Sequence, residues 1–128
     1  MSINNEWHMV KEFHDKFGHG VSDVPVMLPK ARAEKRYKWM LEEIDEFLEA
    51  EDIVEQADAM IDLIYFALGT LVEMGVKPEK PFEIVQQANM AKLWEDGKPH
   101  YRDSKVIKPA NWVDPYPEMK ACVERGGV

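Results

Sequence analysis

The chain has 128 residues, enough for one domain with its own hydrophobic core and too few for two ordinary domains. Its 16 Lys and Arg against 24 Asp and Glu give a formal net charge of −8, which argues against a nucleic-acid partner because such surfaces neutralise phosphates with cations. Cys122 is the single cysteine, which excludes an intrachain disulfide and a cysteine-based zinc site. We expect one cytoplasmic domain spanning residues 1–128.

No segment of the sequence predicts a membrane partner. The first ten residues carry no basic stretch followed by an apolar run, which a secretory signal would need. The longest apolar stretch, Met60–Val72, is interrupted by Asp62 and is too short to span a bilayer. A soluble protein is therefore expected.

Helical periodicity dominates the first two thirds of the chain. Apolar residues at helical spacing predict four helices, which run roughly over Asn4–Phe17, Lys30–Glu49, Asp52–Met74 and Pro81–Leu93. Asp52 and Glu55 resemble a capping box at the start of the third helix, and Gly75 ends it. Residues 94–128 are rich in Pro, Gly, Lys and Asp. The prediction is an all-α fold, a four-helix core of antiparallel helices with an irregular C-terminal tail that is mobile over Arg125–Val128.

The third predicted helix carries acids where an apolar surface is expected. From Ala59 to Val72 its only polar side chains are Asp62 and Thr70, which is typical of a buried helix. Asp58 and Asp62 stand four residues apart and therefore share one face. A buried carboxylate needs a partner or loses its charge.

The short linker at Asp52 makes the second and third helices an antiparallel hairpin, which brings four acids together. Glu46 lies six residues before Asp52 and Asp58 six after it, while Glu43 lies nine before and Asp62 ten after. Without a base in register, these carboxylates need protons or hard divalent cations between them. Oxygen-only ligation favours Mg²⁺, with Mn²⁺ as the alternative.

A solvated acidic face is the competing interpretation of the same residues. It is the favoured one for Glu49 and Glu51, and a capping role is the favoured one for Glu55. Asp62 fits it poorly, because apolar residues surround Asp62 in the sequence.

Two stretches, E-E-x-x-E at residues 42–46 and the acidic, then apolar run at residues 55–65, occur in that order. Together they resemble the all-α nucleoside triphosphate pyrophosphohydrolases, the superfamily that contains MazG, dimeric dUTPase and phosphoribosyl-ATP pyrophosphohydrolase. The likeness to phosphoribosyl-ATP pyrophosphohydrolase-like proteins covers most of the chain. It extends through Phe13-His14, Gly69, Gly75, Ala88–Lys92, Asp96–Lys98 and Lys105–Pro109.

The resemblance implies hydrolysis of a nucleoside triphosphate, or a related nucleotide, to the monophosphate and pyrophosphate through attack of water at the α-phosphorus. It also implies that Glu43, Glu46 and Asp62 bind magnesium. Glu42 would act in catalysis beside Glu43 by orienting or deprotonating the attacking water.

One position departs from the superfamily pattern. The usual second motif is E-x-x-D, and the residue three before Asp62 is Ala59. Either Asp58 supplies the missing carboxylate, or Glu55-x-x-Asp58 is the motif shifted by one turn. The matching heights in the hairpin favour Asp58 as a metal ligand together with Asp62.

The residues that we expect to bind the substrate have cationic, amide or imidazole side chains. Asn89 offers a donor and an acceptor to a base or sugar edge. His14 is a further candidate, although its apolar stripe favours a core histidine. The cations that can bind phosphates are Arg36, Lys92, Lys98 and Lys105, with Arg32 and Lys108 nearby.

The third helix has more apolar surface opposite its acids than a four-helix monomer covers, so we expect a homodimer or homotetramer whose second subunit can complete the site. A ferritin-like oxidase is disfavoured because no His stands three residues after a Glu. A noncatalytic, metal-binding helical module for oligomerisation or interaction remains the alternative. The identity of the nucleotide base stays open.

Overall fold

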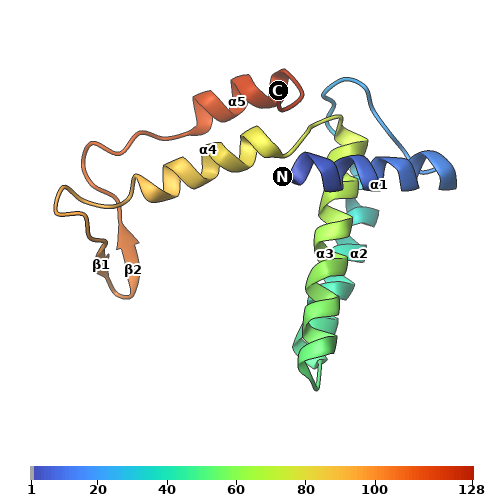
Figure 1. The fold of residues 1–128 in the computed structure, drawn as a ribbon, viewed down its shortest axis with the longest axis horizontal. Coiled ribbons are helices and arrows are strands. Elements are labelled where there is room, and N and C mark those ends of the chain that lie inside the picture. Colours follow the sequence, from blue (N-terminus) through green and yellow to red (C-terminus); the bar gives the residue numbers. More distant parts are fainter. Residues whose placement is uncertain (1) are drawn as a thin grey trace.

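The computed structural model describes residues 2–128 and is mostly helical (Figure 1), which confirms the predicted all-α class. The elements in chain order are α1 (Ile3–Phe17), α2 (Lys30–Glu49), α3 (Ile53–Met74), α4 (Glu79–Met90), β1 (His100–Arg102), β2 (Lys105–Ile107) and α5 (Tyr116–Glu124). Among the described residues, no single helix is long and apolar enough to cross a membrane. Only α3 and α4 taken together have the length and composition, with a bend of 117° between them.

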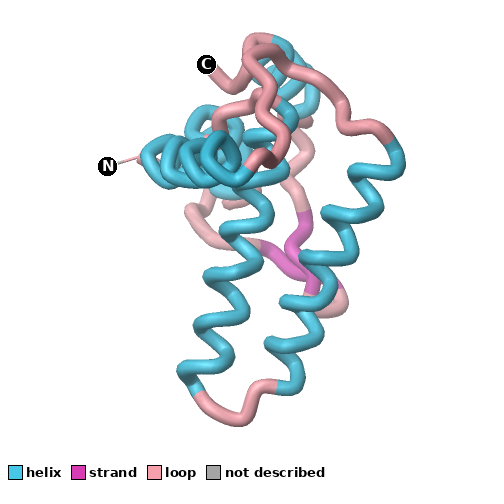
Figure 2. Tube along the Cα trace, turned by 90° about the vertical axis from the view of Figure 1, so that its right-hand side faces the viewer, coloured by secondary structure: helices cyan, strands magenta, loops and turns pink. Residues whose placement is uncertain are grey.

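Helices α2 and α3 form the predicted antiparallel hairpin (Figure 2). The Asp52 carboxylate caps α3 by accepting a hydrogen bond from the Glu55 N–H at 2.8 Å. The Glu55 carboxylate in turn accepts one from the Glu51 N–H at 2.9 Å, one residue before the expected partner. Gly75 ends α3 with φ of 70°, a left-handed conformation that glycine adopts without strain.

Helix α1 crosses the upper part of α3 and buries the main apolar cluster. Trp7 and Val10 of α1 pack there with Leu68 and Val72 of α3. The Val72 side chain is fully buried. The core therefore lies at one end of the hairpin, and the end near Asp52 extends beyond it (Figure 1).

A buried ion-pair network joins α2 to α3 beside this core. Glu73 accepts hydrogen bonds from Arg32 Nε at 2.7 Å and Arg32 Nη2 at 2.9 Å. Arg36 Nε donates to the same carboxylate at 2.5 Å. Burial alone would raise the pKa of Glu73, but the two arginines outweigh it and hold that pKa below its usual value.

His14 connects α1 to this network. Its Nδ1 lies 2.7 Å from the Gly20 carbonyl oxygen, and its Nε2 lies 3.2 Å from Arg36 Nη2. A carbonyl only accepts and a guanidinium only donates, so Nδ1 carries the proton and Nε2 accepts. The ring is neutral, in agreement with a pKa that burial lowers.

The segment after α4 carries more regular structure than its composition predicts. Strands β1 and β2 pair antiparallel, with Tyr101 opposite Val106, around a turn in which Asp103 and Ser104 have φ of 52° and 66°. Such a two-residue turn usually contains glycine, so its Asp-Ser sequence concealed the hairpin. Helix α5 follows and packs on α4.

Two further features differ from the sequence-based expectation. Helix α4 leaves α3 at the 117° bend and packs with α5, so it does not complete a four-helix core within one chain. The C-terminal residues, expected to be mobile, are tied to the connection between α3 and α4 by a 2.9 Å hydrogen bond from the Lys77 N–H to the Gly126 carbonyl.

Gly69→Ala should destabilise the protein by about 2 kcal/mol, since overpacking a filled core has a cost of this order. An added Cβ would lie 2.8 Å from His14 Nε2 and 2.9 Å from Arg36 Nη1, inside the network. Urea unfolding followed by circular dichroism measures the loss. Ala67→Ser, at an exposed position of the same helix, is the control. Equal stabilities of the two variants would contradict the proposed role of the network.

Candidate functional site

The four predicted acids face one another across the α2–α3 hairpin. Glu43 and Asp62 are half-buried, while Glu46 and Asp58 are exposed. Burial and then the neighbouring Glu46 carboxylate raise the pKa of Glu43 to about 7, with smaller contributions from Asp62 and Asp58. Burial, then Asp58 and Glu46, likewise raise the pKa of Asp62. The tertiary structure thus brings together the acids that we had paired by counting residues on either side of the hairpin turn.

The electrostatics of this cluster favour a cation. Glu43 Oε2 is buried and has no hydrogen-bond partner. No Lys, Arg or His occurs in the sequence between Trp39 and Val76, so the parts of α2 and α3 that carry the cluster contain no basic residue. Within residues 2–128, no group of three or more Asp, Glu, His or Cys side chains lies close enough together to hold a metal ion in the observed conformation. Carboxylate oxygens alone, repelling one another, are a donor set suited to a hard divalent ion.

The structure bears on which acid replaces the carboxylate missing at Ala59. Ala59 is 2% exposed, so this motif position is enclosed in the fold. Asp58 acts on the pKa of both Glu43 and Asp62, whereas Glu55 acts on neither. Glu55 is engaged in the cap of α3. These contacts favour Asp58 over a motif shifted to Glu55.

Glu55 nevertheless lines the rim of the cluster. A cleft of about 310 Å³ opens at the end of the hairpin beside Glu46 and Asp58. Its other lining residues are Glu49, Ala50 and Glu55. All its charged walls are acidic, so an anion enters this cleft only together with cations.

A second cavity, of about 200 Å³, lies one helical turn from the acids toward α1. Trp39 precedes Glu43 by four residues, and Phe66 follows Asp62 by four. The Trp39 and Phe66 rings stack with centroids 5.9 Å apart, and the Arg36 guanidinium lies 5.3 Å from the Trp39 ring centroid. The complete lining is Phe13, His14, His19, Arg36, Trp39, Tyr65 and Phe66.

The sequence did not predict this pocket, because aromatic residues at helical spacing usually belong to a core. Its walls come from three helices and the loop after α1. The spacing of apolar residues along the chain does not show how α1 packs against the hairpin. The position of Trp39 and Phe66, each one turn from an acid, was the available signal. His14 and Arg36, predicted to bind substrate, line this pocket while also holding the buried network.

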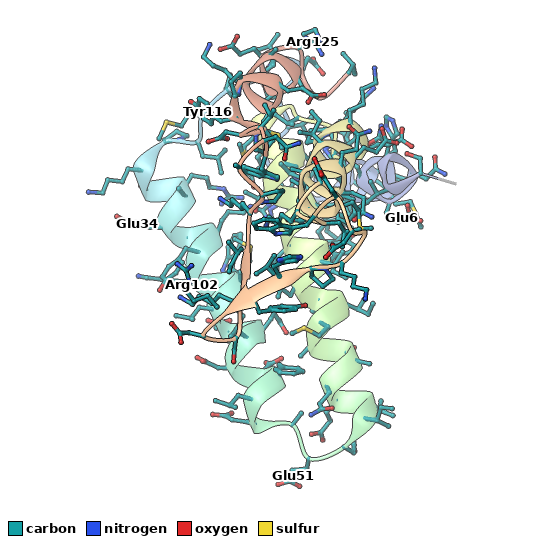
Figure 3. The ribbon with its side chains drawn as sticks, turned by 90° about the vertical axis from the view of Figure 1, so that its left-hand side faces the viewer. Glu6, Glu34, Glu51, Arg102, Tyr116 and Arg125 are labelled. Carbon is teal, nitrogen blue, oxygen red and sulfur yellow. The ribbon has the colours of Figure 1, made fainter. Side chains whose placement is uncertain are left out.

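The other predicted substrate residues lie away from the acids of their own chain. Asn89 is exposed on α4, where its Oδ1 accepts a hydrogen bond from Lys92 Nζ at 2.9 Å. Lys98 and Lys105 lie on the arm formed by β1, β2 and their flanks, to which the labelled Arg102 of Figure 3 also belongs. No cation contributes to the pKa of Glu43 or Asp62. Glu42 is exposed on α2 next to the cluster.

Glu43→Gln should stabilise the metal-free protein, and the gain should increase as the pH rises from about 4.5 to 7. In this window the folded protein holds a proton on Glu43 that the unfolded chain has already released. The free energy of unfolding of the wild type therefore falls as the pH rises, and glutamine removes this dependence. Urea unfolding in a chelator, at several pH values, measures the difference.

Glu34→Gln is the matched control, since Glu34 is an exposed glutamate of the same helix. Its stability curve should run parallel to that of the wild type across the same pH range. A parallel curve for Glu43→Gln as well would show that Glu43 is not held among like charges.

Two comparisons relate the chain to known proteins. A family model described as phosphoribosyl-ATP pyrophosphohydrolase matches residues 10–89, more than half of the chain, including every acid of the cluster. The comparison with curated protein sequences gives no match. The family match supports a pyrophosphohydrolase acting on a nucleotide. The chain therefore belongs to the phosphoribosyl-ATP pyrophosphohydrolase family.

Proposed function

We propose that the protein hydrolyses a nucleoside triphosphate, or a related nucleotide, to the monophosphate and pyrophosphate in the presence of Mg²⁺, with Mn²⁺ as a substitute. Glu43, Glu46, Asp58 and Asp62 would hold the metal. The observation that carries the proposal is the acid cluster itself, which contains a buried carboxylate oxygen without a partner and no basic side chain. The family match supports the same chemistry.

Magnesium, when bound, would polarise the phosphoryl oxygens, make a bound water more acidic and offset charge on the leaving pyrophosphate. The protein's own part is to hold the carboxylates in place. A pKa near 7 means that Glu43 gives up its proton at neutral pH once positive charge is close. Glu42, exposed beside Glu43, would orient the attacking water and accept its proton.

The aromatic pocket is the place we propose for the nucleobase. It is lined mainly by aromatic rings, and a planar base stacks on such rings. Arg36 at its wall can donate a hydrogen bond, and the acids that act on the phosphates begin one helical turn away. This arrangement lets one nucleotide reach both sites.

Incubation with a panel of nucleotides and Mg²⁺ should release pyrophosphate and a nucleoside monophosphate. Asp62→Asn should lower kcat by about 100-fold or more, because it removes a carboxylate that holds the catalytic ion. Anion-exchange chromatography separates pyrophosphate from orthophosphate and identifies the nucleoside product. Orthophosphate with a nucleoside diphosphate would contradict attack at the α-phosphorus.

Asp45→Asn is the matched control for this substitution. Asp45 lies in the same acidic run as Glu43, but two residues along a helix turn it to the opposite side. Its kcat should equal that of the wild type. Equal losses of kcat in the two variants would contradict the assignment of the site to the inner face of the hairpin.

Trp39→Ala should raise KM by about 10-fold with a smaller change in kcat, since stacking on a base contributes about 1–3 kcal/mol. Trp39→Phe keeps an aromatic surface and should recover most of the affinity. Steady-state kinetics give both constants, and circular dichroism checks that each variant folds. A wild-type KM for Trp39→Ala would exclude this pocket as the base site.

A further inference from the structure

The aromatic pocket has two walls that belong to different parts of the fold. Phe13 and His14 of α1 form one wall, which His19 of the following loop continues, and the α2–α3 hairpin forms the other. The Phe13 and Tyr65 rings meet edge to face across them, with centroids 5.8 Å apart. Within residues 2–128, the hydrogen bond between His14 and Arg36 is the only one that joins α1 to α2. This bond therefore fixes the α1 wall relative to α2.

The Arg36 guanidinium has one hydrogen that the protein does not satisfy. Its Nε and Nη2 donate to Glu73, and the second Nη2 hydrogen meets His14 Nε2 at 3.2 Å. Nη1 donates one hydrogen to the Phe66 carbonyl at 3.4 Å, and its other hydrogen has no partner within residues 2–128. Because Arg36 is 3% exposed and lines the pocket, an acceptor for this hydrogen must come from the pocket. A carbonyl oxygen or ring nitrogen of a nucleobase can supply it.

The hydrogen bond between His14 and Arg36 exists only while His14 is neutral. The Nδ1 hydrogen is directed at the Gly20 carbonyl oxygen, 2.7 Å away, so Nε2 keeps the lone pair that accepts from Arg36. A proton on Nε2 would place an N–H against the N–H of Arg36 and add a positive charge to the buried network. An imidazolium has no lone pair with which to accept a hydrogen bond. Protonation of His14 therefore breaks the contact between the two walls.

The groups that face His14 come from three segments, and on balance they favour the neutral ring. The ring centroid of His19, in the loop, lies 5.2 Å away, and Arg36 of α2 is positively charged. Glu73 of α3 is an acid, but two guanidiniums already share its charge. Burial is the largest effect, and with Arg36 and His19 it outweighs Gly20 and Glu73, so the pKa of His14 lies below its usual value.

We propose that His14 is a positioning residue of the base pocket, which holds Arg36 and the α1 wall in place while neutral and releases them on protonation, so that acid weakens nucleotide binding. His14 acts through Arg36 and needs no contact with the nucleotide. This role differs from the direct contact with substrate that the sequence suggested for His14. The link between the walls rests on the contacts of His14 alone, whereas the effect on the nucleotide rests also on the proposed function.

NMR and urea unfolding test the link without any nucleotide. The His14 ring should be neutral at about pH 6.5, with its proton on Nδ1. Below this pH the unfolded chain takes up a proton that the folded protein resists, so acid should raise the unfolding equilibrium constant by up to about tenfold per pH unit. His14→Gln offers Arg36 an acceptor but cannot titrate, so this contribution should disappear. A proton on Nε2, or curves of the same shape for wild type and His14→Gln, would overturn the proposal.

His8→Gln is the matched control, since His8 is an exposed histidine of the same helix outside the pocket. Its unfolding curve should have the same pH dependence as that of the wild type. Circular dichroism checks that each variant folds, and His14→Asn replaces the glutamine variant if that one does not. The carboxylates of the acid cluster are common to all variants, so their titration cancels in the comparison.

Equilibrium dialysis of the common nucleoside monophosphates, in a chelator, tests the effect on the pocket. If only the neutral form of His14 binds, the dissociation constant of the wild type should rise about tenfold for each pH unit below the pKa of His14. His8→Gln should show the same rise, and His14→Gln should lack it. An equal rise in His14→Gln would overturn the proposed effect on binding. If the protein neither binds nor hydrolyses a nucleotide, the proposed function fails, while the unfolding curves still decide whether neutral His14 links the walls.

Discussion

The contact of Glu73 with Arg32 and Arg36 is the interaction on which the rest of the structure depends. A carboxylate this deeply buried is tolerated only because two guanidiniums satisfy it, and removal of either partner would leave a charge in an apolar core. The geometry of the pair sets the register of α2 against α3. Through His14 the same network fixes where α1 crosses the hairpin.

The register of α2 against α3 at this end of the hairpin determines which acids lie opposite one another at the other end. Glu43 lies opposite Asp62, and Glu46 opposite Asp58, in the register that the short linker sets, and the Glu73 ion pairs hold α2 and α3 in that register. The hairpin therefore has two electrostatic halves. One half has its charges paired inside the protein, and the other has acids of one sign that remain unpaired. The stability of the paired half allows the repulsion in the unpaired half to persist, as is common at functional sites.

The aromatic pocket lies between these halves and shares residues with the network. Arg36 is both a partner of Glu73 and part of the pocket wall, and Gly69 allows its guanidinium and the His14 ring to approach α3 closely. The pocket wall is thus held by the same bonds that hold the fold. A site built on packed helices in this way keeps its shape without a ligand.

The sequence by itself determined the first four helices, the α2–α3 hairpin and the acids that meet across it, but not helix α5 in the C-terminal segment. Periodicity and caps such as Asp52 and Gly75 act locally, and a linker this short leaves two helices only one way to pack, so register could be counted from residue numbers. The sequence also showed that Ala59 occupies the position where the superfamily motif has a carboxylate. The tertiary structure decided the rest, because it depends on contacts between distant segments. These are the burial of His14 and Arg36, the aromatic pocket under α1, the turn at Asp103, and the bend that directs the arm of cations away from the acids of its own chain.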